Sequence, residues 1–222
     1  MWRDLYDDLK GRDFTVIAVA MDARDDAARP WIEDAAPSYP CLIDTEHRVA
    51  ALYNMVNVPQ AAWIDERGRI VRPPENAGAF EAFRAMDRDT GKMPDDVARI
   101  AVDARGTYIA AIRDWVDKGA ASEHVFDADS ARARIPVMSD DVALAHANFR
   151  LGLHLIKAGN ADEGDGFLRE ASRLHPDSWN MWRQRYRPNQ MGFASGPEFW
   201  ARVDALGRME YYPAVDMKNM PE

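Results

Sequence analysis

Residues 56–74, VNVPQAAWIDERGRIVRPP, constrain the fold more than any other part of the 222-residue sequence. They contain two short strand-like runs, residues 61–65 and 69–72, which are joined by the polar turn of residues 66–68. Two such runs joined by three residues that include glycine predict a β-hairpin. Pro59 fits just before the first run, because a strand's first position has no ladder hydrogen bond to lose.

The sequence before this hairpin alternates between helical and strand patterns. Residues 14–21, FTVIAVAM, are almost all apolar and rich in β-branched residues, which is typical of a strand buried on both faces of a parallel sheet. Apolar side chains at positions 2, 5, 6 and 9 have the spacing of an amphipathic helix. We further predict helices at residues 26–36, 45–55 and 79–86, and a short extended segment at residues 40–43. This order predicts an α/β domain with a mixed sheet over residues 1–90.

The second part of the sequence, residues 94–222, predicts an α-helical domain. We predict helices at residues 94–118, 140–158, 161–174 and 197–206, and a loop or short extended connection at residues 122–138. The helices at 140–158 and 161–174 are expected to form a hairpin. The aromatic-rich stretch of residues 176–222 is expected either to wrap a core or to form a binding face.

Composition excludes several classes of function. The net charge of −9 and the pI near 5.1 argue against a general surface for nucleic acid or for anionic membranes. No apolar run approaches eighteen residues, so we expect no transmembrane helix. The N-terminus lacks the basic and then apolar layout of a signal peptide, so the chain as written is expected in the cytoplasm.

The chain has one cysteine, Cys41, which excludes an internal disulfide, a Cys-x-x-Cys pair and a cysteine-rich zinc site. The histidines are scattered, so we expect no metal site: His47, His124, His146, His154 and His175. Acidic pairs such as Asp95-Asp96 are interpreted as helix-start residues that complement the helix dipole. No Gly-rich phosphate loop, nucleophile elbow or Ser/His/Asp arrangement is present, and we expect no cofactor.

Taken in order, several segments of residues 1–90 resemble the thioredoxin-fold thiol-disulfide oxidoreductases of the redoxin and TlpA/ResA type. The matching segments are WRDLYDDL, FTVIAVAMD, ARPWIED, YPCLIDTEHRVAALYNMVNVP and AAWIDERGRIV. The resemblance covers about two-fifths of the chain and implies a thioredoxin-like domain.

The resemblance places Val58-Pro59 at the cis-proline position of that family. In the family this loop faces the redox cysteines, and its backbone pairs with the bound substrate as an added strand. A cis X-Pro bond is only about 0.5–1 kcal/mol less favourable than the trans form. The resemblance therefore implies that Val58, Pro59 and Gln60 bind substrate, although Gln60 stands where relatives usually carry Thr.

The chain departs from the family at its start. The family's Trp-Cys-x-x-Cys motif begins the helix that residues 2–10 continue, and that position falls before Met1. The strand that would precede the motif, central between residues 14–21 and 61–65, is also absent. We interpret Met1 as an internal methionine, so that a late start would also have removed any signal peptide. The alternative is a degenerate, redox-dead domain.

Cys41 is the one candidate nucleophile in the chain. It lies in an apolar run, and no Lys, Arg or His is close to it in sequence to stabilise a thiolate. Buried cysteines of this kind usually act as small hydrophobic residues. We therefore favour a packing role for Cys41 over a catalytic one.

The helical hairpin within residues 140–176 resembles a single tetratricopeptide-type unit. The match is carried by Leu151-Gly152, Gly159, Ala171 and Pro176, with Gly164 where that pattern prefers Ala. Small residues at these positions let two antiparallel helices approach closely. One unit alone cannot form the family's peptide-binding groove, so we expect a packing role or a surface for a partner.

The leading hypothesis is a thioredoxin-like protein related to thiol-disulfide oxidoreductases, redox-inactive in this chain because the active-site cysteines are absent. Its partner would be a protein thiol or disulfide substrate. The alternative is a non-catalytic module that binds a protein partner through the helical domain. A third possibility is a peroxidase of the same fold, which would need a single upstream cysteine.

Overall fold

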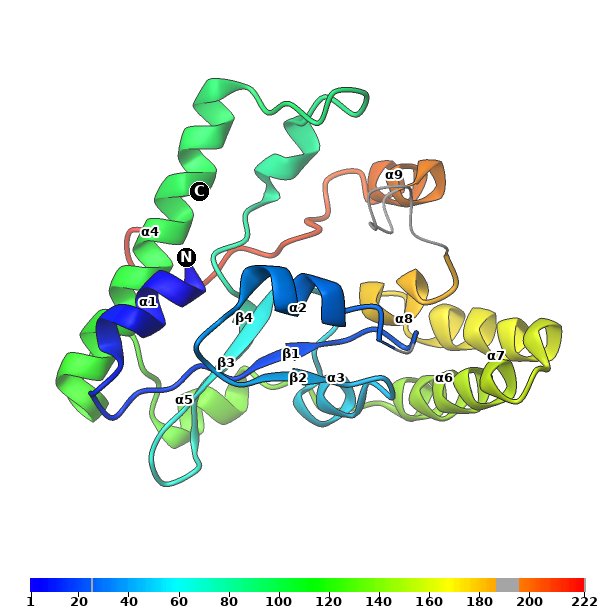
Figure 1. The fold of residues 1–222 in the computed structure, drawn as a ribbon, viewed down its shortest axis with the longest axis horizontal. Helices are drawn as coiled ribbons and strands as arrows, with labels where there is room; N and C mark the ends of the chain where they lie inside the picture. The colour runs from blue at the N-terminus through cyan, green and yellow to red at the C-terminus, as the bar shows by residue number, and fades with distance from the viewer. Residues whose placement is uncertain (25, 187–195, 222) are drawn as a thin grey trace. The chain divides into compact units, whose positions relative to one another are not determined.

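A computed structural model describes residues 1–24, 26–186 and 196–221 (Figure 1). It is an α/β structure with two small sheets and a large helical part. The chain divides into two compact units. The first unit comprises Met1–Val58 and Pro136–Gly196, and the second comprises Pro59–Ile135 and Pro197–Glu222. The domain boundary expected between residues 90 and 94 stays a prediction.

The first unit begins with a helix, which a strand–helix–strand arrangement follows. Helix α1 (Trp2–Leu9) is followed by strand β1 (Ala18–Ala20), helix α2 (Arg29–Ala35) and strand β2 (Cys41–Ile43). The strands pair in parallel, with Ala18 opposite Cys41. Parallel neighbours need a crossover of a dozen or more residues. Helix α2 lies within this crossover, and Figure 1 shows it above the two strands.

Strand β1 is shorter and less buried than its apolar sequence predicts. Its three residues are half-buried, and Ile17 just before it is 59% exposed. Burial on both faces is therefore a wrong prediction. Within the described residues β1 has β2 as its strand neighbour, so a ladder forms along one edge. A strand paired on one side and uncovered on a face cannot bury the whole run of residues 14–21.

Four more described helices belong to the first unit. They are α3 (Arg48–Tyr53), α6 (Asp140–Lys157), α7 (Ala161–Leu174) and the short α8 (Trp179–Arg183). The hairpin of α6 and α7 confirms the two long helices expected here, and Ser139 caps α6 by accepting a hydrogen bond from the amide of Val142. Its core consists of Ala145, Phe149, Leu168, Ala171 and Met181. Leu153 and Leu174 are partly buried against this core.

Two glycines set the distance between α6 and α7. A Cβ atom added at Gly164 would lie 2.6 Å from Cγ1 of Ile156 and 2.7 Å from the carbonyl oxygen of Gly152. A Cβ atom at Gly152 would lie 2.8 Å from the carbonyl oxygen of Gly164. Contacts this short do not occur in folded proteins, so neither helix can carry a side chain here without moving. The helices therefore approach closely because both positions are glycine.

Helix α8 joins the hairpin to the N-terminal part of the first unit. The side-chain amide of Asn180 donates to the carbonyl oxygen of Met55 at 2.8 Å. The backbone amide of Asn180 donates to the carbonyl oxygen of Val56 at 3.1 Å. The amide of Ala23, just beyond β1, donates to Oε1 of Gln184 at 3.0 Å. Residues more than 120 positions apart are thus held by direct hydrogen bonds.

The second unit contains the predicted hairpin, now seen as β3 (Gln60–Ile64) and β4 (Ile70–Asn76). Asp65 fixes the turn, because its Oδ1 accepts hydrogen bonds from the amides of Arg67 and Arg69. Strand β4 runs through Pro73 and Pro74, which the sequence pattern placed beyond the strand. The hairpin itself is confirmed, and its second strand is longer than predicted.

Helix α4 (Asp95–Lys118) packs against this hairpin. The indole N–H of Trp63 donates to the hydroxyl of Tyr108 at 2.9 Å. The ring of Trp63 also stacks on Trp115 at a centroid distance of 5.1 Å. Aromatic pairs of this kind stabilise a core beyond their buried area. These contacts hold α4 against the β3–β4 hairpin.

The remaining elements of the second unit differ more from expectation. They are the 3₁₀ helices η1 (Glu81–Ala85) and η2 (Gly119–Ala121), and the helices α5 (Ala128–Ala133) and α9 (Pro197–Ala205). An α-helix was expected over residues 79–86, and no helix was expected over residues 122–138. Asp127 begins α5 by accepting hydrogen bonds from the amides of Asp129 and Ser130. The sequence carries this signal, because Asp is among the preferred residues at a helix N-cap.

Aromatic residues of the second unit pack on one another. Phe83 lies 4.8 Å from Tyr211 and 5.9 Å from Trp200 between ring centroids, and Tyr211 is buried. The guanidinium of Arg88 lies 4.6 Å from the centre of the Trp200 ring. These contacts favour the core-wrapping interpretation of the aromatic-rich stretch. Its residues 187–195 lie outside the described part of the chain.

The two strand pairs form separate two-stranded sheets in the described residues. A single mixed sheet, which the thioredoxin-like arrangement requires, therefore stays a prediction. In the described ranges, no helix is both long enough and apolar enough to cross a lipid bilayer.

Glycine substitutions in α7 test the close helix contact. We expect Gly164→Ala to destabilise the protein by about 1–3 kcal/mol, because the new methyl group overpacks the contact with α6. Gly166→Ala is the matched control in the same helix, since the nearest atom to its added Cβ lies 3.8 Å away. There the gain in helix propensity, up to about 1 kcal/mol, should stabilise the protein.

Urea unfolding followed by circular dichroism measures both variants. Equal effects of the two substitutions would show that α6 and α7 are not in close contact at Gly164.

Candidate functional site

An open cleft beside β1 and β2 contains the chain's one thiol. Its volume is about 480 Å³, and its described lining comes from residues 20–41 of the first unit. Apolar side chains of Trp31 and Ile32 in α2 form part of the wall, and Cys41 lies at the first position of β2. Small-molecule sites typically have this size and an apolar lining with a few polar groups. The cleft is therefore a candidate site with room for a small molecule.

Cys41 is free and half-buried. Arg24 lines the same cleft, although it is 17 positions away in the sequence. The guanidinium of Arg24 is paired with the carboxylate of Asp22, with an Nε to Oδ1 distance of 2.8 Å. The sequence around Cys41 does not indicate that Arg24 lies near it, because the two residues are far apart along the chain. Because Asp22 already neutralises it, Arg24 is not a dedicated partner for a thiolate.

Tyr39 stands at the edge of the same cleft and packs edge-on against Tyr6, with 5.6 Å between ring centroids. Burial raises the pKa of the Tyr39 phenol, and the neighbouring Cys41 adds to the shift. The phenol is therefore neutral at physiological pH. The chemistry available here is that of one thiol, which can form a mixed disulfide but has no second thiol in the chain to resolve it.

The predicted substrate-binding residues span the point in the sequence where one compact unit ends and the other begins. Val58 ends the first segment of the first unit, and its amide donates to Oδ1 of Asn57 at 2.9 Å. Pro59 begins the second unit, where its carbonyl oxygen accepts a hydrogen bond from the amide of Ala77. Gln60 is the first residue of β3 and stands opposite Asn76. Their role in binding substrate, and the isomer of the Val58-Pro59 bond, stay predictions.

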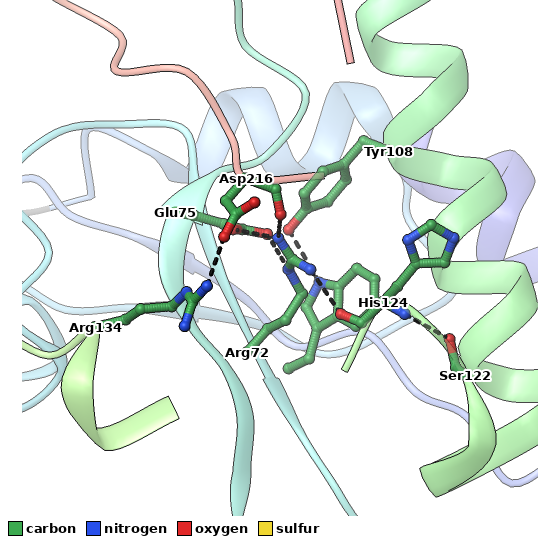
Figure 2. Close-up of polar contacts among 8 residues, drawn as sticks. Arg72, Glu75, Tyr108, Ser122, His124, Arg134 and Asp216 are labelled. Atoms are coloured by element: carbon green, nitrogen blue, oxygen red, sulfur yellow. Dashed lines mark hydrogen bonds and ion pairs between the residues drawn. The ribbon is translucent and has the colours of Figure 1, made fainter. Parts of the chain in front are cut away.

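The second unit contains a buried polar cluster around Arg72 that the sequence did not suggest (Figure 2). Arg72 is 1% exposed, and its Nε and Nη2 donate to the two carboxylate oxygens of Glu75 at 2.5 and 2.9 Å. Its Nη1 donates to the carbonyl oxygen of His124 at 2.6 Å, and its Nη2 to that of Asp216 at 2.8 Å. One guanidinium therefore connects the hairpin, the segment before α5 and the C-terminal segment.

Aromatic rings cover the same guanidinium. Its central carbon lies 4.7 Å from the ring centre of Phe126 and 5.4 Å from that of Trp63. Burial raises the pKa of the Glu75 carboxyl, and the ion pair with Arg72 opposes this shift. Burial also raises the pKa of the Tyr108 hydroxyl, which lies close by in Figure 2. These groups are enclosed rather than open to a substrate.

The cluster continues to Arg134, whose Nη2 donates to the carboxylate of Asp216 at 2.6 Å. This hydrogen bond is the main cause of the lowered pKa of the Asp216 carboxyl. The polar atoms of Arg72 thus face acceptors within the protein itself. We interpret the cluster as a structural contact that holds the second unit together, because the Arg72 side chain is buried and its hydrogen bonds go to three separate segments of that unit.

The described residues contain no group of three or more His, Cys, Asp or Glu side chains that could hold a metal ion.

Residues 1–72 match the family model described as the AhpC/TSA family. This match spans 72 of the 222 residues and supports a relation to redoxin and thioredoxin-like proteins. No curated protein and no solved structure matches the chain significantly. The matched residues include β1, β2 and β3 and end at Arg72 in β4, so they contribute to both compact units.

Substitutions at Arg72 test the structural contact. Arg72→Met should destabilise the protein by about 3–5 kcal/mol, because it leaves the carboxylate of Glu75 buried without its cation. Adding Glu75→Gln should restore part of that loss, since the second change removes the unpaired charge. Denaturant unfolding followed by tryptophan fluorescence measures both variants. A double variant as unstable as Arg72→Met would contradict the assignment.

Proposed function

We propose that the chain is a redoxin-related protein that binds protein thiol or disulfide substrates without completing thiol-disulfide exchange on its own. The single observation that carries this proposal is the AhpC/TSA match of residues 1–72 in a chain with one cysteine. The match supports the redoxin relationship. A chain with one cysteine cannot form the disulfide between two of its own thiols that completes dithiol exchange.

Exchange by a dithiol protein needs two thiols. The first attacks a substrate disulfide and forms a mixed disulfide, and the second releases the reduced substrate. Cys41 could supply the first step alone. Its half-buried position and the Asp22-paired state of Arg24 do not favour an activated thiolate. We therefore assign Cys41 a packing role in the wall of the cleft, and no catalytic role.

Substrate binding is assigned to Val58, Pro59 and Gln60. Pro59 is exposed, and Gln60 begins β3, whose strand neighbour in the described residues is β4. An extended peptide that adds to a strand gains main-chain hydrogen bonds, while side-chain pockets give selectivity. Within the redoxins we favour the TlpA/ResA type, on the resemblance that places Val58-Pro59 at the cis-proline position.

A second candidate function is a protein-interaction module without catalysis. One observation favours it: Leu144 and Leu151 of α6 are 52% and 42% exposed. They are seven residues apart, about two turns, and so lie on one face of the helix. In this reading the tetratricopeptide-like hairpin presents that face to a partner.

Insulin-disulfide reduction by dithiothreitol tests the proposal. The 222-residue chain should precipitate insulin no faster than dithiothreitol alone, and Cys41→Ser should behave identically, because the chain has no resolving thiol. The chain should nevertheless bind oxidised insulin in calorimetry. Pro59→Ala should weaken this binding several-fold by altering the start of β3.

Arg67→Ala is the control for binding, since Arg67 is exposed in the turn of the same hairpin. Turnover above background that Cys41→Ser abolishes would show that Cys41 is catalytic. Absence of binding by the unaltered chain would remove the substrate-binding role and leave the interaction module.

A further inference from the structure

A small cavity in the first unit is lined by three histidines from three different elements. His47 is the residue immediately before α3 (Arg48–Tyr53), His146 belongs to α6, and His175 immediately follows α7. The cavity volume is about 10 Å³, and Phe149 and Asn180 also line it. The N-terminal segment of the unit meets its helical hairpin at this place.

Two of the three imidazoles have buried ring nitrogens that lack the hydrogen bonds such groups need. His47 is 4% exposed and His175 is 7% exposed. Both ring nitrogens of His47, and Nε2 of His146, are buried with no hydrogen-bond partner in the described part of the protein. Buried polar atoms are nearly always paired, and each unpaired one in a native structure requires an explanation.

The backbone and ring packing hold His47 in place. His47 has φ 53° and ψ 34°, the left-handed region that few non-glycine residues adopt. Its ring packs edge-on against Phe149, with 5.1 Å between ring centroids. The rings of His146 and His175 lie 6.2 Å apart. Strained backbone of this kind persists where the surrounding structure fixes it, and it is often found at switch regions.

The size of the cavity limits what can bind there. About 10 Å³ is close to the space of a single water molecule, so an organic ligand does not fit. The side chains around it do not form a metal-holding group within the described residues. Besides a single water molecule, the ligand that these nitrogens can take up is a proton, and only the proton adds a charge to the cavity.

We propose that this histidine pocket is a proton-sensitive latch that holds the α6–α7 hairpin against α3 within the first unit. With neutral imidazoles the three rings pack in the joint. A proton on any of them places a charge in a nearly dry cavity. The charge favours the opened arrangement, in which water solvates the imidazolium.

Charged groups near the latch do not cancel this effect. Asp44 and Asp22 face His47, but Asp44 accepts a hydrogen bond from the amide of Val49, and Asp22 is paired with Arg24. Asp177 faces His175. Helix α8 and the residue before it contribute the uncharged Asn180 and Ser178 to the lining. The carboxylates closest to His47 are therefore already engaged.

Burial determines the direction of the pH dependence. It lowers the pKa of His47 to about 4, and nearby Asp44 opposes the shift. It also lowers the pKa values of His146 and His175. An opened chain binds protons near pH 6.5, whereas the closed latch does not. The stabilisation is therefore complete above about pH 6.5 and is lost as the pH falls through about 4.

Hydrogen exchange of the full chain at pH 8 and pH 5, corrected for intrinsic exchange rates, tests the latch. The opening equilibrium of α3 and α6 should increase about 30-fold on acidification, as follows from pKa values of about 4 closed and about 6.5 open. His47→Asn should remove most of this increase, because asparagine tolerates the left-handed backbone but does not titrate. His154→Gln, exposed on the same helix as His146, should retain it.

An increase that His47→Asn leaves unchanged would overturn the latch. A second measurement does not depend on the folding of a variant, namely titration of the imidazole ring signals by nuclear magnetic resonance in the unaltered chain. A His47 pKa well below 6.5 supports the latch, and a value at or above 6.5 overturns it.

Discussion

The hydrogen bonds of Asn180 to the carbonyl oxygens of Met55 and Val56 are the contact on which the first unit depends. They tie the end of the N-terminal segment to α8, and α8 in turn packs into the core of the α6–α7 hairpin through Met181. The N-terminal segment supplies few fully buried apolar side chains of its own: Leu5, Leu9 and Ala50. A segment with so little core is stable only when other parts of the chain complete it.

This dependence bears on the function. The residues that match the AhpC/TSA family model do not form a self-contained unit, because residues 1–58 fold with the helical hairpin and residues 59–72 with α4 and the C-terminal segment. The helical part of the chain is therefore an integral structural component of the redoxin-related segment. Asn180 also lines the histidine pocket, so the proposed protonation of that pocket would act at the same place as these hydrogen bonds.

Local sequence patterns predicted the elements that depend on local physics. The β3–β4 hairpin follows from a glycine-containing turn, and α4, α6 and α7 follow from apolar spacing over many residues. The apolar run of residues 14–21 predicts a longer and more buried strand than β1. Such a run would be buried in a complete sheet, whereas β1 pairs along one edge within the described residues. The sequence of residues 79–86 predicts an α-helix where the 3₁₀ helix η1 forms, because a short apolar pattern does not distinguish the two helix types.

The polar sites could not be predicted, because each joins residues that are distant in sequence. Arg72 binds the carbonyl oxygen of Asp216, 144 positions away, and reads in the sequence as an ordinary end of a strand. Arg24 lies in the connection between β1 and α2, and it lines the cleft of Cys41 because β1 pairs with β2. His47 and His146 meet only because the helical hairpin folds back on α3. Isolated residues carry no periodic signal, so their partners emerge only from the tertiary structure.

The most direct test of this account is residue-level hydrogen exchange of the unaltered chain and of Asn180→Ala at pH 7. The variant leaves the carbonyl oxygen of Met55 without its donor, which should cost about 1–3 kcal/mol. If the N-terminal segment and the hairpin form one unit, α3 and α6 should lose protection by the same factor. Loss of protection in α3 with α6 unchanged would contradict the account, because the two segments would then open independently.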